Sequence, residues 1–263
     1  MVYMGSKSRY SKYIVPILQN CINKNNIDTY VETFVGGANI IDKIKCKNKI
    51  GSDNNPYLIA LLKKAAEEPK LFLEENSKEA IKPIEDISKE LWDDCRDTAK
   101  VHGDKYPDWF IGFVAFMASY CAGGFGRGYG RTGKDIKRCI SKEHFNNFKK
   151  QIPNLTGINF ICSSYIPVLE SCIKKQNCLL YLDPPYRNTK HYDEKEKFDY
   201  DVFYDLCRRV GENNYVFISE QYMPDDFKVV WSKEVKRLIR ATRAEDGVPI
   251  VIENLYTIGK SNG

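Results

Sequence analysis

The sequence predicts an α/β protein: a mixed, mostly parallel sheet with helices on both faces, and a mostly helical unit inserted into it. Two observations support the sheet. Strand-like apolar segments alternate with helical segments near both ends of the chain. Residues 179–182 form a continuous apolar run that stops at Asp183-Pro184, which is typical of a buried parallel strand. A third observation supports the insert, because the alternation stops from Glu67 to Asn154.

The composition indicates an ordinary globular protein. The chain has 263 residues, of which 43% are hydrophobic and 29% charged, so it is long enough for a core domain with an insert. No apolar run approaches the roughly 18 residues of a membrane helix, and residues 1–7 lack a signal-peptide apolar region. Nine scattered cysteines without a C-x-x-C pair argue against a disulfide framework or a structural metal site. We expect a cytoplasmic protein without a metal.

The first predicted strand, residues 29–35, runs into a glycine turn. Gly36-Gly37-Ala38-Asn39 is expected to open a helix that continues through Ile44. Glycines let the backbone approach a ligand closely, and strand, tight turn and helix are typical of a cofactor-binding unit. The pattern is not the G-x-G-x-x-G fingerprint, and Gly-Gly alone is a weak signal. A helix over residues 8–23, preceded by the glycine turn Tyr3-Met4-Gly5-Ser6-Lys7, comes before this unit.

The second predicted strand, residues 49–53, ends in an acid. Asp53 lies about twenty residues after the glycine turn, a distance at which an acid commonly accepts hydrogen bonds from a ribose. The alternative is an N-cap on the helix that begins at Tyr57. The glycine turn before it favours the ribose role.

The predicted insert carries a concentrated positive charge. Residues 71–100, 107–121 and 141–150 have helical character. From Arg127 to Lys150 there are eight basic and two acidic residues, a net charge of +6 against +5 for the whole chain. Glycines and aromatic residues are mixed into the start of this segment, so it can follow a phosphate backbone and offer stacking faces. A solvated surface loop is the alternative. The candidate DNA contacts are Arg127, Arg131, Lys134, Lys137 and Arg138.

The stretch Asp183-Pro184-Pro185-Tyr186 carries the most specific chemical signal. Pro184 lacks an N–H and fixes φ, so the strand ends there and the turn is rigid. A carboxylate and a fixed backbone carbonyl can both accept hydrogen bonds from an exocyclic amine, and an adjacent aromatic ring can stack on a flat heterocycle. The alternative is a strand that ends in a Pro-Pro turn, with Asp183 as a cap.

The remaining elements complete the alternation. We expect strands at residues 157–162, 215–219, 229–232, 235–240 and 251–258, and helices at residues 165–174 and 198–210. The segments 187–197 and 242–249 are polar and are predicted to lack regular structure.

In their order along the chain, these motifs resemble the Dam-like, alpha-group DNA adenine-N6 methyltransferases, most closely the short versions of phages and mobile elements. The resemblance runs from Tyr3 to Ile258. It rests on Tyr3-Met4-Gly5-Ser6-Lys7, on Glu32-Thr33-Phe34-Val35-Gly36-Gly37, on Asp53, on Asp183-Pro184-Pro185-Tyr186, and on the stretches 217–220 and 224–227.

The resemblance implies a Rossmann-like class I methyltransferase fold with S-adenosylmethionine as cofactor. Residues 1–66 and 155–263 would form the catalytic domain, and residues 67–154 a target-recognition domain. The substrate would be double-stranded DNA whose adenine flips out of the helix. The implied catalytic residues are Asp183, Pro184 and Tyr186, and the implied cofactor contacts are Tyr3, Lys7, Phe34, Gly36, Gly37, Asp53 and Asp183.

Some features depart from the family or stay open. Where many relatives have an acid that contacts the cofactor's adenine, this chain has Cys162-Ser163-Ser164-Tyr165, so no residue is assigned that role. Cytosine-N4 in DNA, an RNA base, a glutamine amide, and a non-catalytic DNA-binding module with a degenerate fold are the alternatives. We expect a monomer, with a dimer left open, in the cytoplasm of a bacterial or phage-infected cell.

Overall fold

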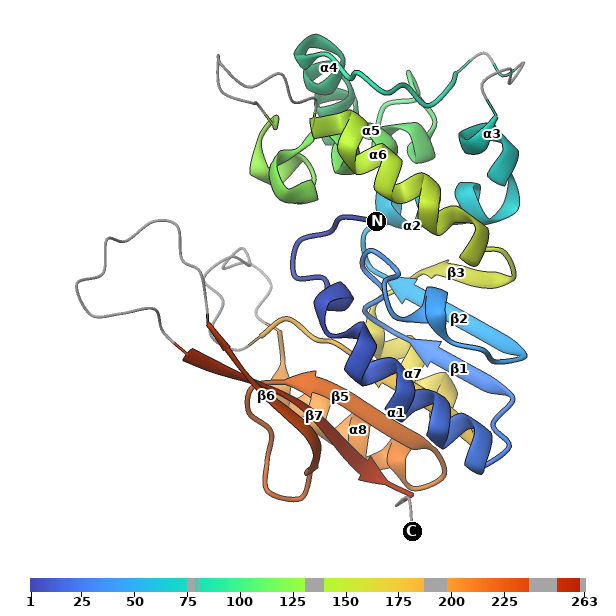
Figure 1. Cartoon of the computed structure of the whole chain (residues 1–263), viewed down its shortest axis with the longest axis vertical. Helices are drawn as coiled ribbons and strands as arrows, with labels where there is room; N and C mark the ends of the chain where they lie inside the picture. The colour runs from blue at the N-terminus through green and yellow to red at the C-terminus, as the bar shows by residue number, and fades with distance from the viewer. Residues whose placement is uncertain (75–78, 80, 131–139, 187–197, 237–249, 261–263) are drawn as a thin grey trace, which may run out of the picture.

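The computed structural model describes residues 1–74, 79, 81–130, 140–186, 198–236 and 250–260. Its centre is a seven-stranded sheet of order β3-β2-β1-β4-β5-β7-β6 (Figure 1). The first five strands in this order are parallel, and β7 is antiparallel to both β5 and β6. The strands are β1 (Thr29–Glu32), β2 (Asn48–Asp53), β3 (Ile158–Cys162), β4 (Cys178–Leu182), β5 (Tyr215–Glu220), β6 (Lys228–Lys236) and β7 (Ile250–Gly259). The prediction of a mixed, mostly parallel sheet is confirmed.

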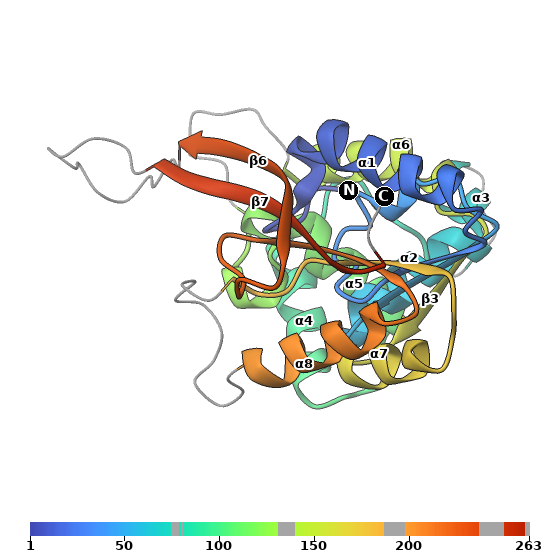
Figure 2. The same cartoon turned by 90° about the horizontal axis from the view of Figure 1, so that it is seen from below.

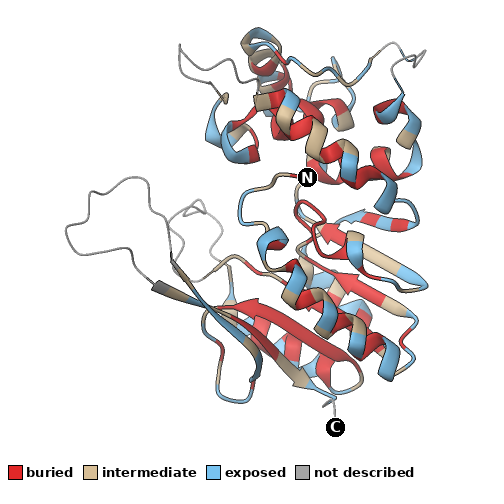
Figure 3. Ribbon diagram, viewed as in Figure 1, coloured by how far each residue is buried: buried red, intermediate tan, exposed pale blue. Residues whose placement is uncertain are grey.

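Helices cover both faces of this sheet. Helix α1 (Ser11–Lys24) lies on one face, and α7 (Tyr165–Ile173) and α8 (Tyr200–Gly211) lie on the other (Figure 2). Each face has its own hydrophobic cluster, because side chains alternate along a strand. Tyr181 and Phe217 belong to the cluster on the α1 side, and Leu180 and Val216 to the cluster under α8. The central strands are therefore buried on both faces, as the red ribbons of Figure 3 show.

The insert is helical and packs against the β3 edge of the sheet. It contains α3 (Pro69–Leu73), α4 (Lys89–Lys100), α5 (Asp108–Ala118) and α6 (Ile140–Gln151). Helix α5 is buried from Phe110 to Ala118 and packs closely on α2 (Pro56–Glu67). At Gly112, an added Cβ would lie 2.1 Å from the Tyr57 carbonyl oxygen, so only glycine permits this crossing.

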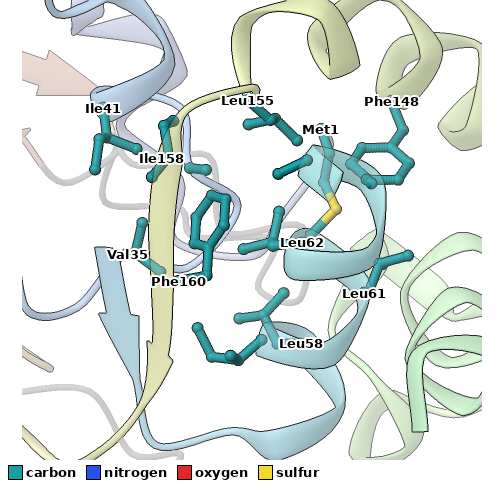
Figure 4. Packing of buried hydrophobic residues seen from close by; sticks show 14 of the residues in the cluster. Met1, Val35, Ile41, Leu58, Leu61, Leu62, Phe148, Leu155, Ile158 and Phe160 are labelled. Carbon is teal, nitrogen blue, oxygen red and sulfur yellow. The ribbon is translucent and has the colours of Figure 1, made fainter. Parts of the chain in front are cut away.

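The insert does not have a core of its own. Phe148 of α6 joins the same hydrophobic cluster as Leu62 of α2 and Phe160 of β3 (Figure 4). A shared core couples the insert to the sheet, because closely packed interiors have low compressibility and transmit strain. The boundaries at residues 66/67 and 154/155, and the role of the insert in target recognition, stay predictions.

Three expected elements differ in the structure. Within the stretch 71–100, which was expected to be helical, residues 81–88 form no helix between α3 and α4. No α-helix follows the glycine turn, where only a short 3₁₀-helix, η2 (Ile41–Lys43), forms. Ala38 has a φ of 56°, in the left-handed region, so the chain cannot enter a right-handed helix there. The expected strands 229–232 and 235–240 are joined in one strand, β6, as far as Lys236, with a register shift between Val229 and Trp231; residues 237–240 lie outside the described residues. Such an irregularity lets the strand keep pairing with β7 although its apolar pattern is interrupted.

No helix in the described ranges is long and apolar enough to cross a membrane. The segments 187–197 and 242–249 lie outside the described residues, so their predicted lack of regular structure stays a prediction.

Candidate active site

The loops that carry the two strongest motifs leave the sheet side by side. Strands β1 and β4 are parallel neighbours, with Glu32 opposite Tyr181. The glycine loop (residues 33–39) and the Asp183–Tyr186 turn therefore emerge at the same carboxyl edge. This is the edge at which open α/β sheets bind their ligands, where the strand order reverses between β1 and β4.

Lys7 and Asp183 form an ion pair at this edge. The Lys7 ammonium lies 2.6 Å from Oδ1 of Asp183, and the two side chains are only 8% and 17% exposed. Lys7 comes from the short 3₁₀-helix η1 (Lys7–Arg9), 176 residues away in the sequence. Burial raises the pKa of the Asp183 carboxyl, and the Lys7 charge opposes this rise. Lys7 therefore favours the ionised, hydrogen-bond-accepting form of Asp183.

Tyr186 lies against the same ion pair. The Lys7 ammonium is 4.5 Å from the centre of the Tyr186 ring, and the Tyr186 hydroxyl donates a 2.6 Å hydrogen bond to Oε2 of Glu253 on β7. Burial and the nearby carboxylates raise the pKa of Tyr186 far above its usual range, so the hydroxyl stays neutral. Lys7 thus contacts the face of the Tyr186 ring, and Glu253 holds its hydroxyl.

Sequence reasoning missed Glu253. It lies in the predicted strand 251–258, in the stretch Val251-Ile252-Glu253-Asn254-Leu255. An acid between apolar residues of a closing strand was a usable signal, but such residues are usually solvated. Only the pairing of β7 with β5, next to β4, brings Glu253 to Tyr186.

The glycine loop encloses the side chain of Tyr3. An added Cβ at Gly36 would lie 2.8 Å from the Tyr3 ring, and one at Gly37 would lie 2.7 Å from Tyr3 Cβ. Gly36 also has a φ of +45°, which favours glycine. The Tyr3 ring packs on Phe116 of α5, with the ring centres 5.8 Å apart. The structure thus brings Tyr3, Gly36 and Gly37 together, and their predicted contacts with the cofactor stay predictions.

Asp53 ties the ends of β1 and β2 together. Its Oδ2 accepts a hydrogen bond from the Gly36 N–H and its Oδ1 one from the Asn55 N–H, both at 3.1 Å. Burial raises the pKa of Asp53, and these backbone donors oppose the rise. Asp53 does not cap α2, because Asn55 is the N-cap residue and accepts from the Leu58 N–H. The capping alternative is therefore wrong, and each Asp53 oxygen has a further lone pair.

Phe34 lies apart from the Tyr3 cluster. Its ring packs against Tyr165 and Phe198, at centre distances of 5.4 and 6.0 Å, and against Phe203 of α8. The neighbouring Thr33 is 1% exposed, and its hydroxyl oxygen has no hydrogen-bond partner among the described residues. The glycine loop thus begins with a buried Thr33 hydroxyl that lacks a hydrogen-bond partner among the described residues. The next residue, Phe34, packs its ring against other aromatic rings.

Gln151 links the insert to the glycine loop. It is the last residue of α6, and its Nε2 donates to the carbonyl oxygens of Gly37 and Ala38 and to Asp42 Oδ2, each at 3.0 Å. Backbone carbonyls of a loop have few ways to be satisfied in a buried site, so these bonds fix the loop conformation. No motif in the sequence indicated this contact.

Of the predicted DNA contacts, the structure describes only Arg127. It is exposed and belongs to the short 3₁₀-helix η4 (Phe125–Arg127) of the insert. The other four, Arg131, Lys134, Lys137 and Arg138, lie outside the described residues.

The fold and the arrangement of this edge define a Rossmann-like methyltransferase. Residues 3–209 match the D12 class N6 adenine-specific DNA methyltransferase family, and the chain belongs to that family. It is therefore an S-adenosylmethionine-dependent enzyme that methylates N6 of adenine in DNA. The cytosine, RNA-base, glutamine and non-catalytic alternatives are thereby set aside.

Other comparisons add little. None of the curated proteins matches the chain. Among solved structures, the chain is similar to the rRNA methyltransferase aviRa from Streptomyces viridochromogenes, with 8% identity and a TM-score of 0.44 over 97% of this chain and 86% of that one.

Proposed function

We propose that Asp183, Pro184 and Tyr186 hold the target adenine for methylation. The adenine amine would donate one hydrogen to the Asp183 carboxylate and the other to the Pro184 carbonyl. This withdraws the nitrogen lone pair from the ring and makes it available to attack a methyl group. Tyr186 would stack on the base, which must turn out of the duplex to enter the site.

The glycine loop and its neighbours are proposed to hold S-adenosylmethionine, which supplies an electrophilic methyl group on a sulfonium. Two observations fit. The Thr33 hydroxyl is buried without a hydrogen-bond partner among the described residues, and Asp53 keeps a lone pair on each oxygen. We assign Tyr3, Phe34, Gly36, Gly37 and Asp53 to this site, and Asp183 to its border with the base. Lys7 would contact the cofactor's carboxylate only if its ion pair with Asp183 is shared or exchanged.

The insert is proposed to bind double-stranded DNA through its basic loop (residues 123–138). Arg127 is exposed on the insert, and the shared core fixes the insert relative to the catalytic edge. A fixed distance between a DNA-binding surface and a catalytic pocket suits the methylation of one base within a recognised site. We propose that the enzyme acts as a monomer, because one chain contains both the DNA-binding surface and the catalytic pocket. We also propose that it acts in the cytoplasm.

One observation carries the catalytic assignment: the ion pair between Lys7 and Asp183 joins the N-terminal motif to the catalytic turn at the carboxyl edge of β1 and β4. The test is to express the protein and its Asp183→Ala variant in a host without DNA methylation and sequence the genomic DNA for modified bases. We expect N6-methyladenine at one recognition site with the protein and none with the variant. Methylated adenine at the same level with Asp183→Ala would reject the assigned role.

A further inference from the structure

Glu220 is a buried acid at the same sheet edge that the motif does not include. It is the last residue of β5 and is 2% exposed. Strand β5 pairs in parallel with β4, with Ile218 opposite Leu182, so Glu220 ends its strand beside the strand that leads into Asp183. The charges of Asp183 and Lys7 act on the Glu220 carboxyl, so the three groups lie at the same edge.

One oxygen of Glu220 is not satisfied within the protein. Its Oε1 accepts a 2.7 Å hydrogen bond from the Gln221 N–H, whereas Oε2 is buried and has no hydrogen-bond partner among the described residues. The backbone after Glu220 is held by β7, because the Gln221 carbonyl accepts hydrogen bonds from Asn254 Nδ2 and from the Tyr256 hydroxyl. A buried acceptor without a partner costs free energy, which points to a ligand that supplies the missing donor.

The groups around Glu220 set its acidity. Burial is the main cause that raises its pKa to about 7. The carboxylates of Asp183 and Glu253 raise it further, and Lys7 lowers it; the Tyr256 phenol also faces Glu220 from β7. A carboxylate with such a pKa is a far better proton acceptor near neutral pH than an ordinary glutamate.

The other acids of this edge are already engaged: Glu32 accepts from the Tyr30 hydroxyl, and Asp53 accepts from backbone N–H groups. Asp183 is paired with Lys7, and Glu253 accepts from Tyr186. Burial raises the pKa of Asp183, and the contact with Lys7 opposes this rise and occupies the carboxylate. Glu220 is therefore the acid whose unpartnered oxygen can still take a proton.

We propose that Glu220 accepts the proton that the adenine amine loses during methyl transfer. The amine nitrogen forms a bond to the methyl carbon, and the carbon–sulfur bond breaks with its electron pair going to sulfur. The amine nitrogen then carries a positive charge, because it has gained a methyl group and still holds both of its hydrogens. That proton passes to Oε2 of Glu220, which becomes a neutral carboxylic acid and later releases the proton to solvent. The inference rests on the proposed placement of the amine at Asp183 and Pro184.

The test is the pH dependence of single-turnover methylation by the full-length protein, the Glu220→Gln variant and the Glu220→Asp variant. Glu220 must be ionised to act, so the wild-type rate should rise about tenfold per pH unit below pH 7 and level off above it. Glu220→Gln should be about 10²-fold slower on the plateau and should lose this rise, as expected when a general base is removed. Glu220→Asp should keep the rise and have an intermediate plateau.

Two controls make the outcome specific. Glu212→Gln removes an exposed acid just after α8 and should leave the profile unchanged. Affinities for cofactor and DNA should be the same in Glu220→Gln and wild type, because the proposed role begins after both are bound. A Glu220→Gln variant with the wild-type plateau, or with its rise still centred near pH 7, would overturn the proposal. That result leaves the Asp183 assignment standing, because that assignment is judged by Asp183→Ala alone.

Discussion

The catalytic edge and the basic loop use charge in opposite ways. At the edge, Lys7 and Asp183 are largely buried and in direct contact, and Glu220 and Glu253 add negative charge around them. In the basic loop, Arg127 is exposed, and the loop is rich in glycine. Buried charges interact strongly at short range, whereas exposed charges are screened by salt.

This difference determines which step of the reaction each region can control. The edge can fix the protonation state of one carboxyl and the position of one amine. The loop can attract a polyanion over its whole length, but its contacts weaken as salt is added. Each region should therefore respond to a different variable: the edge to pH and the loop to salt.

Lys7→Met is expected to have the largest effect on methyl transfer. It removes the cation and keeps the length of the side chain. The pKa of Asp183 is already raised by burial, and loss of Lys7 would raise it further. Asp183 would then stay protonated to higher pH. We expect methyl transfer to fall by about 10²-fold at pH 7 and to recover partly as the pH is raised.

Lys12→Met is the matched control for this prediction. Lys12 is an exposed lysine near the start of α1, away from Asp183. Its variant should keep the wild-type rate and pH profile. If Lys7→Met also keeps both, the buried pair does not control the protonation state of Asp183.

The next largest effect is expected from Tyr186. The ring is proposed to stack on the base, and stacking contributes about 1–3 kcal/mol, so Tyr186→Ala should lower methyl transfer by roughly 5- to 150-fold. Tyr186→Phe keeps the ring and loses only the hydrogen bond to Glu253, so it should retain most of the activity. Equal losses in the two variants would show that the hydroxyl, and not the ring, is required.

A smaller effect is expected at the link between the two regions. Gln151→Ala removes the donors to the Gly37 and Ala38 carbonyls, so the glycine loop should hold the cofactor less firmly. Leaving buried carbonyls unsatisfied costs about 1–3 kcal/mol. We expect weaker cofactor binding by calorimetry and a lower melting temperature. Lys150→Ala, at an exposed neighbour on α6, should change neither; unchanged cofactor affinity in Gln151→Ala would separate the insert from the cofactor loop.

The smallest effect is expected from Arg127→Ala. If Arg127 contacts one phosphate, the slope of log affinity against log salt should become shallower by about 0.9. Affinity at physiological salt should fall only a few-fold, without a change in the methylated site. Lys47→Ala, an exposed lysine before β2, is the control. An unchanged slope for Arg127→Ala would place the DNA surface elsewhere.

Much of the fold was predictable because the alternation of apolar and polar residues reports directly on strands and helices. The run 179–182 and its proline stop predicted β4 and the turn after it, and both are present. The helix expected after Gly37 does not form. The left-handed conformation of Ala38 depends on its tertiary surroundings. No periodicity in the sequence could reveal that.

The site was predictable only in part, for a related reason. Short motifs identified Asp183, Tyr186 and the glycine loop, since their residues are adjacent in the sequence. The partners Lys7, Gln151 and Glu253 come from distant segments. The sheet order brings Glu253 to Tyr186, whereas Lys7 and Gln151 reach the motifs from helices packed beside the sheet. The contact of Lys7 with Asp183 was not foreseen, and its predicted contact with the cofactor stays a prediction.

The most direct test of the central claim is a crystal structure of the protein with its DNA site and a cofactor analogue that cannot donate a methyl group. The account predicts that the target adenine lies outside the helix against Tyr186. Its amine nitrogen should be about 2.7–3.2 Å from both a carboxylate oxygen of Asp183 and the carbonyl oxygen of Pro184. An adenine bound elsewhere, or an amine in contact with neither oxygen, would contradict it.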